Sequence, residues 1–146
     1  MNVIKSLLFA VAVLVSTPVF ARAPVPIVNY PAVQVASGSG KTLTVDQIRQ
    51  TIRVAAQRKG WEVMNHAAGK LIAMYMWRTH SITVEITPIS GGYSLVYKDS
   101  TNMNYAPEAY WDSTNEEAKG VPVIHPFYNR YVNDLNTAIR LEFKTL

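Results

Sequence analysis

The sequence predicts an α+β fold of two layers, in which an antiparallel four-stranded meander carries an N-terminal and a C-terminal helix on one face, in the order α-β-β-β-β-α. Three observations lead to this prediction. Between residues 61 and 99, apolar residues alternate with period two, and β-branched and aromatic types dominate, as is typical of strands. Residues 44–59 and 124–143 instead repeat their apolar positions with the period of an amphipathic helix. Turn-forming residues separate these segments.

The length and composition indicate one globular domain. The chain has 146 residues, of which 49% are hydrophobic and 16% are charged. The formal net charge is +4, yet no run of five or six like charges occurs. This mild charge indicates solubility rather than a nucleic-acid-binding or membrane-binding patch, and we expect no nucleic acid as a partner.

The first 21 residues have the pattern of a signal peptide. Lys5 precedes an apolar run over residues 7–15, and small or β-branched residues lead up to a predicted cleavage after Ala21. The apolar run is shorter than the roughly 20 residues that a membrane-spanning helix needs. The chain has no cysteine, which excludes disulfides, thiolate metal ligands and a lipid anchor on cysteine. We therefore expect an exported, periplasmic protein with no stable membrane anchor.

Residues 22–42 are expected to form a flexible leader ahead of a single domain over residues 43–146. Three prolines and a run of Gly and Ser favour extended chain. Residues 38–42 resemble the end of a phosphate-binding loop, but Val35 stands where that motif needs its first glycine. Nucleotide binding is therefore not predicted.

The first helix is predicted over residues 44–59. Thr44 and Gln47 have the spacing of a capping box, and Gly60 supplies a C-terminal stop. The apolar stripe of this helix consists of Ile48, Ile52 and Ala55. Another face, carrying Arg49, Arg53 and Gln57, is expected to be solvated. A short strand over residues 61–65 follows.

The second and third strands are predicted to form a tight hairpin. Arg78 and Thr79 are the candidate turn residues between them. The pairs that this turn would place on one face are Trp77–His80, Tyr75–Ile82, Ala73–Val84 and Leu71–Ile86. Because that face is apolar, it must be the core.

A turn at residues 89–92 is expected to continue the register into the fourth strand. The pairs expected there are Ile86–Leu95, Val84–Tyr97 and Ile82–Asp99. Asp99 is thereby predicted on the core side at the end of the sheet, diagonal to His80. A one-residue slip would send it to the other face.

The C-terminal helix is predicted over residues 124–143, after a long loop at residues 100–123. Pro126 suits the first helical position, which makes His125 the residue expected to cap the helix. Loops as long as the one before it are uncommon and are often functional.

The polar end of the sheet is a candidate ligand site. Aromatic rings beside amides, imidazoles and a cation suit a glycan, a peptide or another small ligand. The candidate ligand-binding residues are Arg78, His80, Asp99, Asn102, Asn104, Tyr105, His125 and Asn129. The same cluster is also compatible with an ion pair that closes the end of the core.

The face of the sheet away from the core is a candidate interface, because it carries an apolar stripe among polar residues. The candidate interface residues are Ile72, Met74, Met76 and Val96. Either a covering segment of the chain or a partner would bury this stripe, and a homodimer through this open face is one such arrangement.

Four motifs carry a resemblance to a known group of proteins. They are Arg58-Lys-Gly-Trp61, Arg78-Thr-His80, Tyr97-Lys-Asp-Ser-Thr-Asn-Met-Asn-Tyr105 and Ile124-His-Pro-Phe-Tyr-Asn-Arg-Tyr131. Over residues 45–142, the chain resembles a family of small exported bacterial proteins and lipoproteins of uncharacterised function. The resemblance implies an exported location and a compact α+β fold. The chain departs from the lipoproteins by lacking the anchoring cysteine, and it has a longer insertion around residues 106–123.

Two classes of function remain. The first is a non-catalytic binding or interaction module for an unknown small ligand, glycan or protein. The second is a hydrolase that uses His80 or His125 as general base and Asp99 to orient it. No serine in a strained turn accompanies these residues, and the three histidines lack the spacing of metal ligands, so we expect no metal and no cofactor. The sequence favours the binding module.

Overall fold

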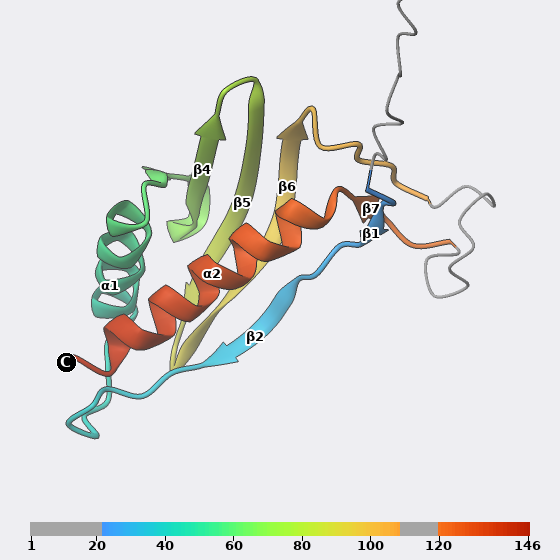
Figure 1. Ribbon diagram of the computed structural model, residues 1–146. Coiled ribbons are helices and arrows are strands. Elements are labelled where there is room, and N and C mark those ends of the chain that lie inside the picture. The colour runs from blue at the N-terminus through green and yellow to red at the C-terminus, as the bar shows by residue number, and fades with distance from the viewer. Residues whose placement is uncertain (1–21, 109–119) are drawn as a thin grey trace, which may run out of the picture.

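The computed structural model describes residues 22–108 and 120–146, and it confirms the α+β class. The described fold consists of a five-stranded antiparallel sheet, two α-helices, a short 3-10 helix and a separate pair of two-residue strands (Figure 1). The elements are β1 (Val25–Pro26), β2 (Tyr30–Gln34), α1 (Val45–Arg58), β3 (Glu62–Asn65), the short 3-10 helix η1 (Ala67–Gly69), β4 (Leu71–Trp77), β5 (His80–Ile89), β6 (Gly92–Thr101), β7 (Val123–Ile124) and α2 (Pro126–Phe143).

The main sheet has one strand more than the sequence predicts. Its order is β2-β6-β5-β4-β3, so the expected four-stranded meander is present and β2 joins it beside β6. Strand β2 comes from the segment that was expected to be a flexible leader, where the local strand signal is weak and the partner strand is distant in sequence. Pro31 obscures the strand pattern, although a proline is tolerated in an edge strand because one side of that strand needs no ladder bond. Tyr30 and Val33 of this strand pack against the core.

The β4–β5 hairpin has the predicted register. All four predicted pairs are present, from Trp77 opposite His80 to Leu71 opposite Ile86. The turn between them consists of Arg78 and Thr79, and Arg78 has a positive φ of 51°. The short turn fixes the pairing, and the alternating pattern then decides which side chains face the core.

The predicted position of Asp99 is wrong. The pairs Ile86–Leu95 and Val84–Tyr97 are as expected, but the register shifts between Thr83 and Val84. Asp99 therefore lies opposite Thr83 instead of Ile82, and it is exposed. Because a bulge adds one residue to one strand, it moves the following side chains to the other face of the sheet. Asp99 thus lies on the open face, away from His80.

Helix α1 begins with the predicted capping box. The Thr44 hydroxyl accepts a hydrogen bond from the Gln47 amide at 3.2 Å, and the Gln47 side-chain oxygen accepts one from the Thr44 amide at 2.9 Å. These two bonds satisfy backbone donors that a helix start otherwise leaves unpaired. The predicted stripe of Ile48, Ile52 and Ala55 is buried.

Arg53 is not solvated as expected, because its side chain binds the edge of the sheet. Its guanidinium donates to the backbone carbonyl of Val63 at 2.9 Å and to the side-chain oxygen of Asn65 at 2.5 Å. Strand β3 is an edge strand, and its outward carbonyls would otherwise have no partner in the sheet. Helix α1 therefore shields part of this edge.

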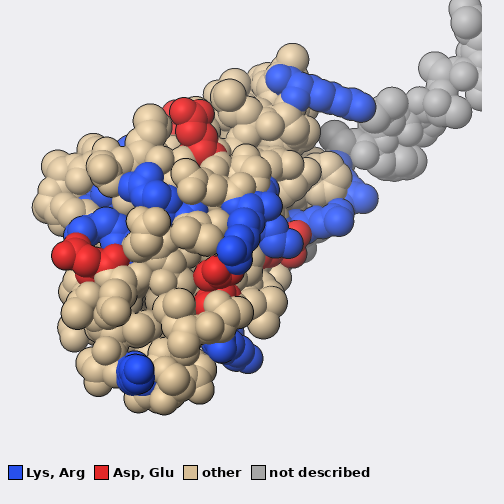
Figure 2. Space-filling model, turned by 90° about the vertical axis from the view of Figure 1, so that its left-hand side faces the viewer, with Lys and Arg blue, Asp and Glu red and all other residues tan. Residues whose placement is uncertain are grey.

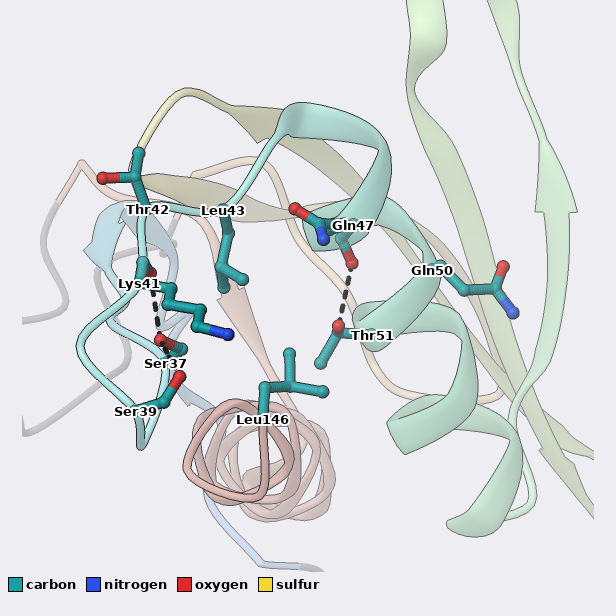
Figure 3. A pocket seen from close by; sticks show the side chains of 9 residues that line it. All are labelled: Ser37, Ser39, Lys41, Thr42, Leu43, Gln47, Gln50, Thr51 and Leu146. Carbon is teal, nitrogen blue, oxygen red and sulfur yellow. Dashed lines mark hydrogen bonds between the residues drawn. The ribbon is translucent and has the colours of Figure 1, made fainter.

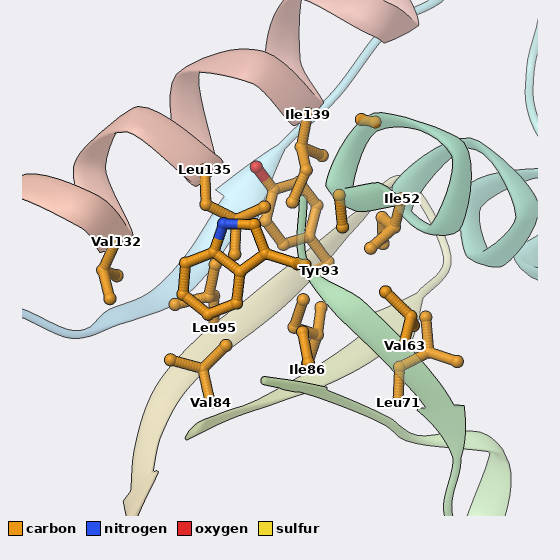
Figure 4. Packing of buried hydrophobic residues seen from close by; sticks show 14 of the residues in the cluster. Ile52, Val63, Leu71, Val84, Ile86, Tyr93, Leu95, Val132, Leu135 and Ile139 are labelled. Atoms are coloured by element: carbon orange, nitrogen blue, oxygen red, sulfur yellow. The ribbon is translucent and has the colours of Figure 1, made fainter. Parts of the chain in front are cut away.

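The core lies between the two helices and one face of the sheet. Figure 4 shows Val132, Leu135 and Ile139 of α2 reaching toward side chains that rise from the strands. Tyr93 is fully buried among them, and its hydroxyl donates to the Asn136 side chain at 2.7 Å. Each large apolar side chain buried in this layer contributes roughly 1.5–3 kcal/mol to stability. Helix α2 crosses the sheet diagonally (Figure 1), and its first turns lie near the ends of β6 and β7.

Within residues 22–108 and 120–146, neither helix is long and apolar enough to cross a membrane.

Candidate functional site

A cavity of about 400 Å³ lies where the β4–β5 hairpin meets the start of α2. The hairpin supplies its end and its turn, the chain after β6 supplies one side chain, and the first residues of α2 close the other side. The lining residues are Trp77, Arg78, His80, Met103, His125 and Phe127. Three of them, Arg78, His80 and His125, belong to the predicted ligand site, so the structure brings this part of the prediction together.

A row of aromatic rings leads along β4 into this cavity. The Trp77 ring lies 5.3 Å from the His80 ring and nearly parallel to it, at 11°. On its other sides it meets Tyr131 at 4.8 Å and Tyr75 at 5.7 Å. Trp77, Tyr75 and Tyr131 are all partly exposed, so these rings pack on one another without being sealed from solvent. Aromatic side chains in this state bind apolar or planar ligand surfaces at low entropic cost, since they have few rotatable bonds.

His125 caps α2 as predicted and borders the cavity. Its Nδ1 atom accepts a hydrogen bond from the Phe127 amide at 3.2 Å, and its own amide donates to the Met103 carbonyl at 2.8 Å. An Nδ1 that accepts a bond carries no proton, so the neutral ring is assigned the tautomer with its proton on Nε2. Partial burial, together with the positive charges of Arg22 and His80, lowers the pKa of His125.

His80 is held by stacking rather than by hydrogen bonds. Its Nδ1 atom is buried and has no hydrogen-bond partner among the described residues. A buried polar atom without a partner costs free energy, so such an atom beside a cavity needs an explanation. The ring lies stacked against Trp77.

Two arginines lie close to the cavity. Arg78 stands at the hairpin turn, and the Arg22 guanidinium lies 5.0 Å from the centroid of the Phe127 ring. None of the lining residues is Asp or Glu. The site therefore combines flat apolar surfaces with positive charge.

The other predicted ligand residues do not line this cavity. Asn102 donates to the Thr79 carbonyl at 2.6 Å and thereby braces the hairpin turn. Tyr105 stacks on Tyr97 at 4.7 Å. Asn102 and Asn104 both have a positive φ, at 56° and 50°, as asparagine tolerates in turns.

Asn129 fastens the N-terminal segment to α2. Its side-chain oxygen accepts from the Val28 amide at 2.9 Å, and its amide group donates to the Pro26 carbonyl at 2.8 Å. Strands β1 and β7 pair close by, with Val25 opposite Ile124. Asn129 therefore holds backbone together instead of facing a ligand.

The sequence did not single out Trp77, Met103 and Phe127 as lining residues. The signal for Trp77 was present, because the predicted hairpin already paired it with His80 at the end of the sheet. The position of Phe127 follows from the helix cap, because its backbone amide donates the capping hydrogen bond to His125. Met103 carries no local signal, because its place depends on how the chain folds back after β6.

A second cavity, of about 420 Å³, lies at the start of α1 (Figure 3). Its hydroxyl groups bind within the protein: Ser37 donates to the Lys41 carbonyl at 2.9 Å, and Thr51 donates to the Gln47 carbonyl at 2.8 Å. At Gly38 the chain passes so close to α2 that an added Cβ would lie 2.2 Å from the Lys144 carbonyl oxygen. The Gly and Ser run therefore packs against the end of α2, and this cavity has fewer groups left for a ligand.

The candidate interface lies on the open face of the sheet. Met76 is 63% exposed, whereas Ile72 is only 8% exposed. The ion pair between Lys70 and Glu85, at 2.7 Å, lies beside Ile72, since Glu85 pairs with it across the ladder. The hydrogen bond from Lys70 lowers the pKa of Glu85. Strand β2 lies beside β6 and not over this face, and the interface stays a prediction.

Charges on the described surface are mixed rather than gathered by sign. Figure 2 shows Lys and Arg side chains interspersed with Asp and Glu over the face that it presents. Among the described residues, no group of three or more His, Asp or Glu side chains is placed to hold a metal ion.

A comparison of the chain with protein-family models, with curated proteins and with solved structures finds no match.

Proposed function

We propose that the protein is an exported, periplasmic binding module without catalytic chemistry, and that its ligand site is the cavity between the β4–β5 hairpin and α2. The proposal retains Arg78, His80 and His125 from the predicted site. It replaces the other predicted ligand residues with Trp77, Met103 and Phe127, which line the cavity.

One observation carries this proposal: partly exposed aromatic rings border a cavity that also holds two imidazoles. Ligand pockets are usually about 300–1,000 Å³ and combine apolar walls with a few polar groups that fix orientation. The cavity between the β4–β5 hairpin and α2, called the hairpin-tip cavity below, has this size and composition. Its aromatic wall is held by a strand pair, so it needs little rearrangement to receive a flat ligand.

The alternative function, a hydrolase, depended on a carboxylate next to a histidine base, and the structure separates these groups. A histidine base is usually oriented by a carboxylate, but Asp99 lies opposite Thr83 on the other face of the sheet. The His125 Nδ1 atom, which such a carboxylate would bind, already accepts the Phe127 amide. No serine and no carboxylate line the cavity. Binding is therefore the function that the geometry supports best.

The resemblance to small exported proteins and lipoproteins implies an exported location and no activity. Three of its four motifs reach this cavity: residues 78–80 supply Arg78 and His80, residues 97–105 supply Met103, and residues 124–131 supply His125 and Phe127. The proposed export rests on residues 1–21, which lie outside the described part of the chain.

A ligand screen tests the proposal. The mature chain is titrated with a library of mono- and oligosaccharides, amino acids and short peptides, and binding is mapped by amide and imidazole chemical shifts. We expect hits to perturb His80, His125 and Phe127, and to lose affinity in Trp77→Ala. His125→Asn provides a second variant, because asparagine can keep the cap.

Gln50→Ala is the matched control, since Gln50 is exposed and lines the cavity at the start of α1. It should leave the affinity of every hit unchanged. Hits that map to that other cavity, or that bind Trp77→Ala as well as the unaltered chain, would contradict the proposed site.

A further inference from the structure

We propose that the ligand of the hairpin-tip cavity carries an oxyanion, a carboxylate or a phosphate, attached to a flat ring. This inference rests on the proposed function and names the class of ligand for the same site. The ring would lie against the aromatic wall, and the oxyanion would meet the cations at the rim.

The charge around the cavity is the first observation. Arg78, His80 and His125 line it, and Arg22 lies over the Phe127 ring. The carboxylate that the sequence would have placed here, Asp99, lies on the opposite face because of the bulge in β6. The described residues thus bring two guanidinium groups and two imidazoles together without an acid among the lining side chains.

The effect of the neighbouring groups on His125, which borders the cavity, is the second observation. Partial burial, and after it the charges of Arg22 and His80, lower the pKa of His125. Like charges that approach in this way disfavour the protonated imidazole, and an anion between them would have the reverse effect. The electrostatics of the site therefore favour a negative ligand.

Arg78 is the third observation. It occupies the first turn position of the hairpin with a φ of 51°, a conformation in which glycine is favoured and other residues are strained. It is exposed and takes part in no ion pair among the described residues. A guanidinium held at a strained position beside a cavity suits an oxyanion, which it binds through two parallel hydrogen bonds.

The aromatic wall gives the second half of the ligand. Trp77 and Phe127 both line the cavity, and Trp77 is part of a continuous row of rings. Flat rings bind by offset stacking or edge contacts on such surfaces. A simple inorganic anion would use only the rim, so the structure favours a ring that bears the charge.

Benzoate and benzamide provide the test, because they share a ring and differ in charge. Both are titrated against the mature chain, with inorganic phosphate as a third probe, while the pKa of His125 is followed by histidine NMR. We expect benzoate to raise the pKa of His125 and to bind roughly tenfold more tightly than benzamide. Arg78→Gln should abolish this preference.

Arg140→Gln is the matched control, since it removes the same charge from an exposed position in the last turn of α2. It should leave the preference for benzoate intact. Phosphate that raises the pKa of His125 as far as benzoate does would overturn the ring as part of the ligand, because the anion alone would then suffice. An effect of benzoate alone would support the ring and assign the oxyanion as a carboxylate.

Equal binding of benzoate and benzamide would overturn the inference and leave the proposed function standing, since the cavity would then bind rings regardless of charge. An unchanged pKa of His125 with all three probes would also overturn it. Retention of the preference in Arg78→Gln would overturn the role of Arg78. The library screen, which includes neutral ligands, decides separately whether the cavity is a binding site.

Discussion

The imidazole of His80 lies flat against the indole of Trp77, with 5.3 Å between the ring centroids and 11° between the ring planes. The two residues are the last pair of the β4–β5 hairpin, so the strand ladder positions both backbones. The hydrogen bond from Asn102 to the Thr79 carbonyl then braces the turn beyond them. The wall of the cavity is therefore fixed by strand register, and changes in the turn can alter charge without moving the rings.

We expect Arg78→Gly to stabilise the fold by roughly 0.5–1 kcal/mol. The left-handed backbone costs a non-glycine residue roughly 1–2 kcal/mol, and the larger entropy that glycine loses on folding offsets part of the gain. Urea unfolding measures the change. The same variant should lose the preference for benzoate. Ala68→Gly is the control, since Ala68 has a φ of 55° at the other end of β4. Ala68→Gly should be more stable than the unaltered protein and should bind benzoate equally well. An Arg78→Gly variant that is less stable than the unaltered protein would mean that the arginine side chain itself supports the turn.

The protein should become less stable on acidification through the titration range of His125. Its pKa in the folded state lies below the value of about 6.5 found in unfolded chains. Between these two values the unfolded state binds more protons, so the free energy of unfolding falls as the pH falls. His125→Asn keeps a capping side chain but does not titrate, and it should show a smaller loss between pH 7.5 and pH 5. Equal losses in both proteins would contradict the assigned direction.

Removal of the Arg53 side chain should expose the edge of the sheet. Arg53→Ala takes away the donor to the Val63 carbonyl, which we expect to cost roughly 1–3 kcal/mol and to leave β3 open to pairing with another chain. Light scattering should show a mass that rises with protein concentration. Gln57→Ala, an exposed position on the same helix, should not change the mass. A monodisperse Arg53→Ala would show that β3 is too short to pair with another chain.

Asn129→Ala should release the N-terminal segment. It removes the partners of the Val28 amide and the Pro26 carbonyl, with an expected loss of roughly 1–3 kcal/mol. Hydrogen exchange should accelerate at Val28 while Ile86 and Leu95 in the central strands stay protected. Asn129→Asp keeps the hydrogen-bond acceptor and loses the donor. Its exchange rate at Val28 should therefore lie between those of the unaltered protein and Asn129→Ala. Unchanged exchange at Val28 would show that the β1–β7 pairing holds the segment alone.

The features that the sequence predicted correctly are those that depend on neighbouring residues. The capping box at Thr44, the cap at His125 and the two-residue turn at Arg78 each contain their own signal within a few positions. The hairpin register followed from that turn. Its consequence for the site, the pairing of Trp77 with His80, could be predicted for the same reason.

The features that it missed depend on distant parts of the chain. Strand β2 exists because β6 offers it a partner, and its own five residues include a proline at the second position. The bulge opposite Thr83 carries no local mark, yet it decides on which face Asp99 lies. The approach of Phe127 and Tyr131 to the hairpin depends on how α2 crosses the sheet, and the period of the helix does not contain that information.

The anchoring of residues 25–34 has a consequence for the order in which the protein folds. Val28 binds Asn129, which is 101 residues away in sequence, and Tyr30 binds Asn133, which is 103 residues away. Contacts between such distant residues form late, because the intervening chain must first be brought together. Val28 and Tyr30 therefore stay without these two partners until the last helix is in place. Until β2 pairs with it, the exposed side of β6 is the edge at which folding chains associate most readily with one another.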